Sequence, residues 1–274
     1  MDSATSASHL QDDHFIDVQQ VRKIYETPRG SVEAVSSATF AVARGEFVAI
    51  LGPSGCGKTT LLMMCGGLES VTSGRIDVAG EPMTKPRTNI GVMFQDPTLL
   101  AWKSVSENIM FPVNILNLSR REYESRVAEL IDLVGLQGFA DKRPRELSGG
   151  MRQRVAICRA LVYDPDVLLM DEPFSALDAI TRDEMNEVLL DIWQQYTKTA
   201  LFVTHSIREA VLLADRVLVM TRRPATVVED LTVPFARPRS MEISESQEFS
   251  EICAHLRRLI ESGNTSHRRA RPVA

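Results

Sequence analysis

Short apolar runs alternate with amphipathic stretches along most of this chain. Residues 15–25 and 32–43 alternate apolar and polar side chains, which is the pattern of strands that bury one face. Apart from its first residue, the segment 46–51 is apolar and ends at a glycine, so we predict a short strand buried on both faces. The apolar stretch at 59–68 is compatible with a helix. The first part of the chain is therefore expected to hold three strands followed by a helix.

The same two patterns recur to the end of the chain. Between residues 97 and 163 the helical pattern dominates, so we interpret this block as a helical insertion between strands. Strands that alternate with helices indicate an α/β fold with a largely parallel sheet. Further strands are predicted at 74–80, 90–95, 167–170, 200–203 and 216–220, and further helices at 120–133, 149–162, 180–196, 207–214 and 248–260.

Composition and charge exclude few classes of protein. The 274 residues suffice for one large domain or two modest ones, and the formal net charge of −5 gives no whole-chain signal for nucleic acid or an anionic membrane. The best apolar stretch, at 211–220, is broken by Asp215 and Arg216 and is shorter than the roughly 18–20 residues that span a bilayer. The Ser-rich residues 1–13 lack an apolar centre and are not expected to be a signal peptide. If the protein serves a membrane, it does so through a partner.

A glycine-rich segment after the strand at 46–51 carries the clearest chemical signal. Its glycines let successive backbone N–H groups point at one anion, and the helix that follows aims its positive end at the same place. Lys58 would reach the β and γ phosphates of a nucleotide, and the Thr59 hydroxyl would bind Mg²⁺. We therefore predict ATP binding here. The segment Gly52, Pro53, Ser54, Gly55, Cys56, Gly57, Lys58, Thr59 matches the pattern G-x-x-x-x-G-K-[ST], and Thr60 follows it in the same site.

Cysteine spacing predicts reduced thiols in a cytosolic protein. The four cysteines form neither C-x-x-C pairs nor a disulfide framework. Cys56 lies inside the phosphate-binding loop, so its alkylation would block nucleotide. The alternative, a small residue that fills the loop, is the simpler interpretation.

Two acids follow the apolar run at 168–170. Ligands of open α/β sheets bind at the carboxyl ends of strands, where Asp171 and Glu172 fall. Asp171 would hold Mg²⁺ through water, and Glu172 would polarise an attacking water. A plain strand-to-turn pair of acids is the alternative. A kinase could share both nucleotide motifs, so they indicate a nucleotide without saying what its energy is used for.

Residues 147–154, Leu-Ser-Gly-Gly-Met-Arg-Gln-Arg, resemble the signature peptide of ABC ATPases. A Ser-Gly-Gly turn that opens a helix is itself an anion site. An ordinary N-cap before a surface helix is the alternative for Ser148. In that family Ser148, Gly149 and Gly150 would face the γ phosphate held by another subunit. The resemblance implies a P-loop NTPase fold, with a RecA-like core, an antiparallel β subdomain and the ABC α-helical subdomain.

Other positions match the same family pattern. Tyr25 falls where an aromatic stacks on adenine, with a buried strand aromatic as the alternative. Gln95 resembles the glutamine that meets Mg²⁺ and senses the membrane partner, and His205 resembles the switch histidine between γ phosphate and attacking water. Residues 175–178 resemble the loop that crosses the dimer interface. The resemblance thus implies catalysis by Glu172, His205 and Gln95, and Mg²⁺ binding by Thr59, Gln95 and Asp171.

The expected domain limits follow from these motifs. Residues 1–14 are predicted to be disordered. Residues 15–230 are predicted to form the ABC ATPase domain, with its helical subdomain at about 96–162. Residues 231–274 form a C-terminal extension with one helix and a basic tail at 267–271.

Three uses of such an ATPase differ in the sequence features that they require. Repair ATPases usually carry coiled coils or zinc modules, and ribosomal factors usually carry two tandem ATPase domains; this chain has one set of motifs and no Cys clusters. A transporter subunit needs no such additions. A soluble ABC ATPase that acts on nucleic acid or the ribosome remains the alternative.

Residues 94–102 with Asn108, and residues 204–217, resemble the subfamily that imports nitrate, sulfonates and taurine. Leu99, Leu100 and Trp102 would help form a groove for a membrane permease, with core packing as the alternative. The resemblance implies a second ATPase subunit, an integral-membrane permease dimer and, indirectly, a solute-binding protein as partners, with no nucleic acid. It places the chain on the cytoplasmic face of the inner membrane as a peripheral protein.

Overall fold

The computed structural model describes residues 14–28 and 30–268, and of residues 262–268 only the backbone. The predicted disordered start therefore lies outside the described residues except for His14, and the side chains of the predicted basic tail lie outside them too. The chain forms two compact units. The first holds the described residues up to Arg87 and from Thr199 onward, and the second holds Thr88–Lys198. The domain limits expected from the sequence stay a prediction.

The first unit is built on a mixed sheet with the strand order β5-β4-β1-β2-β10-β9-β3-β8. β1, β2, β4 and β5 pair antiparallel, whereas β9, β3 and β8 run parallel. All residues of β3 and β8 are buried, as the continuous apolar pattern predicted for strands covered on both faces. The strands are β1 Ile16–Thr27, β2 Gly30–Val42, β3 Phe47–Leu51, β4 Ser73–Val78, β5 Glu81–Pro82, β8 Thr199–Thr204, β9 Arg216–Met220 and β10 Ala225–Thr232.

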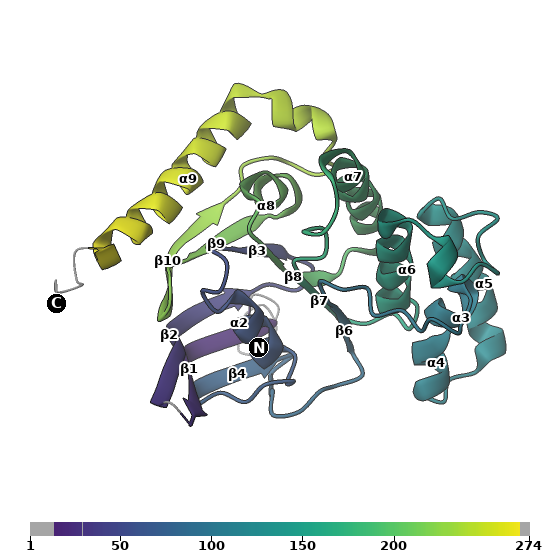
Figure 1. Cartoon of the computed structure of the whole chain (residues 1–274), viewed down its shortest axis with the longest axis horizontal. Coiled ribbons are helices and arrows are strands. Elements are labelled where there is room, and N and C mark those ends of the chain that lie inside the picture. Colours follow the sequence, from purple (N-terminus) through teal and green to yellow (C-terminus); the bar gives the residue numbers. More distant parts are fainter. Residues whose placement is uncertain (1–13, 29, 269–274) are drawn as a thin grey trace, which may run out of the picture. The chain divides into compact units, whose positions relative to one another are not determined.

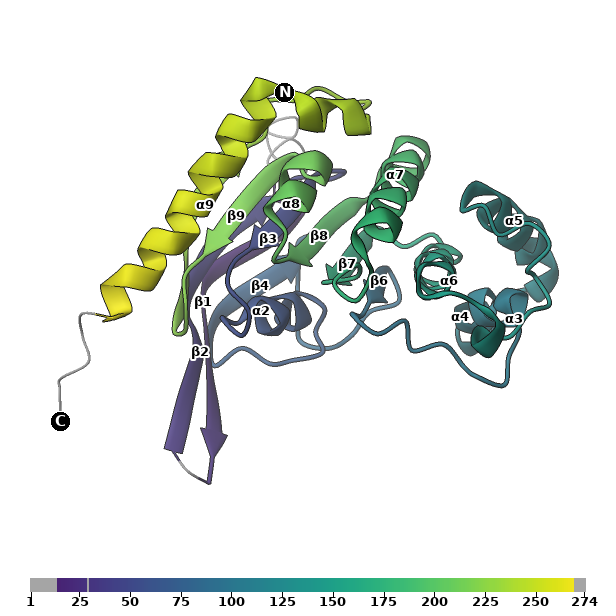
Figure 2. The same cartoon turned by 45° about the horizontal axis from the view of Figure 1, so that its top comes forward.

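Helices cover both faces of this sheet. α2 (Lys58–Cys65) packs on one side of it, against β2, β4 and β8 (Figure 2). α8 (Ile207–Leu213) packs on the other side, against β3, β8 and β9, and α9 (Gln247–Arg268) lies over α8 and β9 (Figure 1). A short 3₁₀ helix, η2 (Met241–Glu245), leads into α9. The predicted C-terminal helix is therefore present and longer than 248–260.

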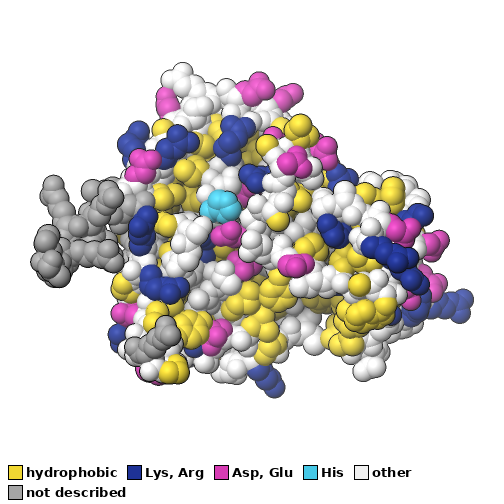
Figure 3. Space-filling view, in the orientation of Figure 1, with side chains coloured by type: hydrophobic (Ala, Val, Ile, Leu, Met, Phe, Trp, Pro, Cys, Tyr) yellow, Lys and Arg dark blue, Asp and Glu magenta, His cyan; other side chains and the backbone are white. Residues whose placement is uncertain are grey.

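The second unit combines two parallel strands with helices. Met93 of β6 pairs with Met170 of β7. Apolar side chains reach the surface beside α4, at the lower right of Figure 3; Ile115 is 63% and Leu118 39% exposed. Within the part of the chain that the structure describes, no helix is both long and apolar enough to cross a bilayer. The elements are β6 Ile90–Met93, β7 Val167–Asp171, α3 Val105–Ile109, α4 Phe111–Ile115, α5 Arg120–Leu133, η1 Pro144–Glu146, α6 Gly149–Leu161 and α7 Ala179–Tyr196.

The elements that the sequence pattern missed include β10, α3 and α4. β10 was not predicted because its sequence does not alternate apolar and polar residues, although the burial of its side chains alternates from Val227 onward. α3 and α4 have five residues each, which is too short for a helical period to show. α3 instead carries a local signal, since Ser104 accepts from the backbone of Glu107 while the Glu107 carboxylate accepts from the backbone of Ser104.

Arg239 fastens the start of the C-terminal extension to α8. Its side chain is 4% exposed and donates to the carbonyl oxygens of Phe235, Leu212 and Ala214. It also lies 3.5 Å from the carboxylate of Asp215. Burial lowers the pKa of Arg239 to about 10, so the guanidinium is still charged at neutral pH. One cation therefore satisfies the carbonyls at the end of α8 and joins two segments of the first unit.

Replacing this guanidinium should destabilise the fold. Arg239→Met keeps the length of the side chain but leaves buried carbonyls without a donor, which costs about 2–4 kcal/mol of unfolding free energy. Urea unfolding followed by circular dichroism measures the loss. Arg257→Met, at an exposed position on α9, is the matched control and should change the free energy by less than about 0.5 kcal/mol. Equal midpoints for both variants would contradict the assignment.

Candidate functional site

The phosphate-binding loop connects β3 to α2 in a conformation that requires glycine. Gly55 and Gly57 have φ values of +72° and +121°, in the region that L side chains rarely adopt. A Cβ atom added at Gly57 would lie 2.9 Å from the carbonyl oxygen of Ala34 on β2. Since β3 is wholly buried, the loop starts from a rigid strand. The backbone is thus shaped as the sequence motif predicted for a phosphate cradle.

Lys58 is held over this loop. Its side chain is 3% exposed, and its Nζ donates to the carbonyl oxygens of Gly52 at 2.9 Å and Pro53 at 3.1 Å. A buried ammonium placed on backbone carbonyls is ready to receive an anion. No acidic residue occupies the first turn of α2, so its N-terminus keeps its positive potential. Thr59 is exposed at the start of the helix. These features fit the phosphates of ATP.

Tyr25 lies on β1 beside the start of α2. Its hydroxyl is 3.5 Å from Oγ1 of Thr60 and 3.4 Å from a carboxylate oxygen of Glu69. The Lys23 ammonium lies 4.8 Å from the centre of its ring. The side chain is half-buried rather than enclosed in the core. Its stacking on adenine stays a prediction, and its place next to the loop supports it.

His205 follows β8 in the first unit, and its side chain is exposed. It stands between Thr204, the last residue of the strand, and Ser206, the N-cap of α8. The Ser206 hydroxyl accepts the backbone N–H of Glu209 at 3.3 Å. The strand end and the helix cap therefore fix the backbone on both sides of the histidine.

Asp171 and Glu172 end β7 in the second unit. Asp171 is 8% exposed, at the end of a strand whose residues are all buried. Glu172 is half-buried and has a φ of +42°, which is unusual for a residue with a side chain. Such strain costs on the order of 1–3 kcal/mol and collects at functional sites. Because β6 and β7 are parallel neighbours, Gln95 leaves the same edge of this strand pair as the two acids.

Ser148 begins α6 as its N-cap, with its Oγ accepting the backbone N–H of Met151 at 3.2 Å. A Cβ atom at Gly150 would lie 2.6 Å from Cγ2 of Thr181 on α7, so the helix packs closely there. The N-cap interpretation of Ser148 is therefore confirmed. It does not exclude an anion site, because Ser148 is exposed and the helix N-terminus behind it carries positive potential.

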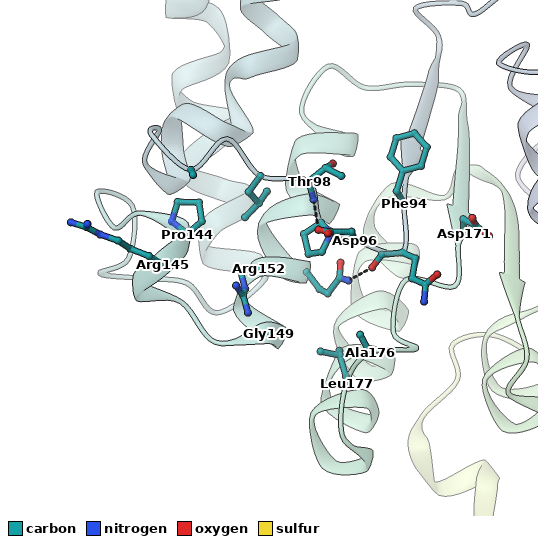
Figure 4. A pocket seen from close by; sticks show the side chains of 15 residues that line it. Phe94, Asp96, Thr98, Pro144, Arg145, Gly149, Arg152, Asp171, Ala176 and Leu177 are labelled. Carbon is teal, nitrogen blue, oxygen red and sulfur yellow. Dashed lines mark hydrogen bonds between the residues drawn. The ribbon is translucent and has the colours of Figure 1, made fainter.

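An open groove of about 1040 Å³ lies in the second unit (Figure 4). Asp171 is at one end of it, and Arg145 lies at the opposite side and points away from Asp171. Leu99 lines the groove, and Trp102 is 70% exposed, which excludes core packing for its side chain. The contact of these residues with a permease stays a prediction. The lining residues are Phe94, Gln95, Asp96, Pro97, Thr98, Leu99, Ala101, Pro144, Arg145, Gly149, Arg152, Gln153, Asp171, Ala176 and Leu177.

Gln153 is a site residue that the sequence motifs did not single out. It is 2% exposed, and its Nε2 donates to the backbone carbonyl of Gln95 at 3.0 Å. Its Oε1 has no hydrogen-bond partner within the described chain. It links the helix that starts at Ser148 to the loop of Gln95. The available signal was a glutamine within a helix face that is otherwise buried and apolar, since Gly150, Ala156 and Ile157, three or four residues away on the same face, are buried.

Each unit brings part of the predicted site together. In the first, Tyr25 adjoins the phosphate-binding loop through Thr60. In the second, the groove brings Gln95, Gly149 and Asp171 into one lining. The residues predicted to cross a dimer interface also lie there. Among them, Asp178 caps α7, and its hydrogen bond from the backbone of Thr181 lowers the pKa of its carboxyl group.

Known proteins resemble this chain over most of its length. The family described as "ABC transporter" matches residues 35–175. A nitrate import ATP-binding protein of Synechococcus elongatus is 45% identical over 242 residues, which cover 87% of this chain and 88% of that protein. The chain belongs to the ABC transporter family. The family resemblance inferred from residues 147–154 is thus confirmed.

Further relatives of this ABC protein are import or transport ATP-binding proteins. An aliphatic sulfonates import ATP-binding protein of Bacillus cereus is 42% identical, covering 86% of this chain and 92% of its own. A taurine import ATP-binding protein of Burkholderia pseudomallei is 44% identical, covering 80% and 84%. A bicarbonate transport ATP-binding protein of Synechococcus elongatus is 43% identical over 88% of both chains. These relatives confirm the predicted likeness to nitrate, sulfonate and taurine importers.

Solved structures confirm the ABC fold. A dimeric bacterial ABC transporter cassette has a TM-score of 0.71 and 30% identity, covering 81% of this chain and all (100%) of its own. A dimeric ATP-binding cassette in a post-hydrolysis state, bound to ADP and Pi, has a TM-score of 0.70 and 29% identity, with the same coverage of 81% and 100%. The predicted P-loop NTPase architecture of this ABC ATPase is therefore correct.

Cys56 in the loop of this ABC ATPase should be a poorly reactive thiol. It is 2% exposed, and burial raises its pKa while the nearby Lys58 charge opposes the rise. A raised pKa leaves less thiolate at pH 8, so iodoacetamide should label native Cys56 at least about tenfold more slowly than the urea-unfolded chain. Peptide mass spectrometry measures both rates, and the half-buried Cys253 is the internal comparison. Labelling as fast as in urea would contradict the loop-filler interpretation.

Proposed function

We propose that this chain is the ATP-hydrolysing subunit of an importer for a small anion, such as nitrate, an aliphatic sulfonate or taurine, which passes through a separate permease. The observation that carries the proposal is the phosphate cradle with its buried Lys58, in a chain related to import ATP-binding proteins. The alternative, a soluble ABC ATPase that acts on nucleic acid or the ribosome, has no support among the relatives named above.

Nucleotide binding is assigned residue by residue. The loop from Gly52 to Thr59, with Thr60, holds the phosphates of ATP, and Tyr25 stacks on the adenine. Thr59, Gln95 and Asp171 would hold Mg²⁺. Their hydroxyl, amide and carboxylate oxygens suit this hard cation. Bound Mg²⁺ supplies positive charge that offsets the charge developing on the phosphates.

We assign hydrolysis to Glu172, His205 and Gln95. Glu172 accepts a proton from water as the water oxygen bonds to the γ phosphorus and ADP leaves. His205 orients that water and contacts the γ phosphate, and Gln95 reports the state of the site to the groove. The strained backbone of Glu172 and the exposed side chain of His205 support these roles.

A second subunit completes each nucleotide site. Ser148, Gly149 and Gly150 bind the γ phosphate held by the partner, using the N-terminus of α6. The exposure of Ser148 and the dimeric state of the related cassettes support this arrangement. Two identical chains thus enclose two nucleotides, and hydrolysis reopens the dimer.

Removing the base should trap the closed dimer. Glu172→Gln keeps the shape of the side chain but cannot accept a proton, so ATP remains bound and hydrolysis falls by at least about 10²-fold. Size-exclusion chromatography with ATP and Mg²⁺ should show a stable dimer. Lys58→Ala in the same background is the control and should give neither nucleotide retention nor a dimer. Full ATPase activity of Glu172→Gln without a trapped dimer would remove Glu172 as the base.

The permease binds at the groove of the second unit. We propose that residues 96–162 act as the helical subdomain and that Leu99, Leu100 and Trp102 contact a permease helix. The exposed Trp102 and Phe94 support this surface, because large apolar side chains open to solvent often mark protein contacts. A solute-binding protein delivers the anion to the permease on the other side. The chain is then a peripheral protein at the cytoplasmic face of the inner membrane.

Growth tests identify the solute. The solutes of the related proteins share small size and an oxyanionic group. A strain deleted for this chain should fail to grow on one of three media, with nitrate as nitrogen source or with an alkanesulfonate or taurine as sulfur source. The wild-type gene should restore growth, and the Glu172→Gln gene should not. Normal growth of the deletion strain on all three media would overturn the proposed solute class.

A further inference from the structure

A closed set of hydrogen bonds surrounds the backbone of His205. The Thr204 hydroxyl donates to Oε2 of Glu209 at 2.5 Å, and the same hydroxyl oxygen accepts the backbone N–H of Ser206 at 2.9 Å. The backbone N–H of Glu209 in turn donates to the Ser206 hydroxyl at 3.3 Å. In the sequence, His205 lies between Thr204 and Ser206, two of the residues that form these hydrogen bonds. The Thr204 hydroxyl therefore links the peptide unit between His205 and Ser206 to the Glu209 carboxylate.

Burial makes this arrangement costly unless it is complete. Thr204 is 2% and Glu209 4% exposed. A buried carboxylate loses the stabilisation of water, and only hydrogen bonds within the protein offset that loss. Replacing a buried polar pair by an apolar pair of the same volume is often neutral or stabilising. The contribution of Thr204 and Glu209 is therefore to fix the direction of the backbone rather than to raise the free energy of unfolding. It fixes where the turn after β8 points.

The other end of α8 is fixed as well. Arg239 donates to the carbonyls of Leu212 and Ala214, at the end of the helix. Glu209 lies in the first turn of the same helix. Because α8 is anchored at its end, Glu209 is a fixed point to which Thr204 and Ser206 are tied. Loss of the Thr204 hydroxyl would release the turn but leave the helix in place.

We propose that Thr204 and Glu209 are positioning residues that hold His205 at the γ phosphate for hydrolysis. Neither touches the nucleotide; both act through the backbone of His205. The proposal rests on the role of His205 in the proposed function. A histidine displaced by about 1 Å still allows nucleotide to bind but loses its alignment with the attacking water, and such misplacement costs up to about 10²-fold in rate.

A set of matched variants of the full chain tests this inference. Thr204→Val removes only the hydroxyl and should lower kcat at least about tenfold, with KM for ATP unchanged within about twofold. Thr204→Ser, which keeps the hydroxyl, should restore kcat. Thr199→Val is the control. Thr199 is 1% exposed at the other end of β8, where its Oγ1 accepts the backbone N–H of Gly45. This control should lose stability but keep kcat.

A double-mutant cycle separates positioning from folding. Single-turnover hydrolysis of radiolabelled ATP is measured for Thr204→Val, His205→Ala and the double variant. If Thr204 acts through His205, its substitution adds less than about twofold in the His205→Ala background. If the losses multiply, the positioning role is wrong although the proposed function stands. If His205→Ala alone hydrolyses ATP at the wild-type rate, the assigned role of His205 in the proposed function fails instead.

A second pair of variants covers the case in which Thr204→Val does not fold. Glu209→Gln keeps an oxygen that accepts the Thr204 hydroxyl, whereas Glu209→Met keeps the length without an acceptor. The Met variant should lose at least about tenfold in kcat and the Gln variant less than about threefold. Equal rates for the two variants would overturn the proposal.

Discussion

The close approach of backbone to backbone at the phosphate-binding loop is the constraint from which the rest of the site follows. A side chain at Gly57 would meet the carbonyl of Ala34, and one at Gly52 would lie 2.9 Å from the carbonyl of Met220. The loop is thus confined between β2 and the end of β9. That confinement sets the position from which α2 starts and over which the Lys58 ammonium is held. The same fit explains why Cys56, packed against Gly52, is buried rather than reactive.

A second feature shared by several parts of the site is a buried strand that ends in a polar residue. β7 ends at Asp171 and β8 at Thr204, and all residues of both strands are buried. A fully packed strand cannot shift without opening cavities, so the polar group at its end is placed precisely. Burying Asp171, Thr204 and Glu209 removes their hydration, and hydrogen bonds within the protein must offset the free energy lost. The positive φ of Glu172 also lowers the stability of the fold, and backbone strain of this kind is typical of functional sites.

Much of this architecture could be predicted because its signals are local. The continuous apolar runs of β3 and β7, the glycines of the loop and the amphipathic pattern of α5 each follow from a few neighbouring residues. β10 could not be predicted, because its pairing with both β2 and β9 is decided by distant strands. α3 and α4 were too short for periodicity to show. Gln153 and Glu209 lie inside the segments 147–154 and 204–217, but the motifs indicated no role for either, although each is a polar residue at a buried position of a helix.

The sequence by itself determined the ABC family, and it predicted the candidate chemistry of the phosphate loop, the two acids, the signature peptide and the histidine. These motifs can be recognised because each consists of a few residues at short spacing within one loop or strand end. Only the tertiary structure decided which side chains support them. The link from Gln153 to the carbonyl of Gln95 joins residues 58 positions apart. The clamp of Arg239 on α8 and the burial of Thr204 with Glu209 likewise depend on the packing of complete elements. Burial and long-range hydrogen bonds are properties of the assembled fold, because they arise only when distant segments exclude water together.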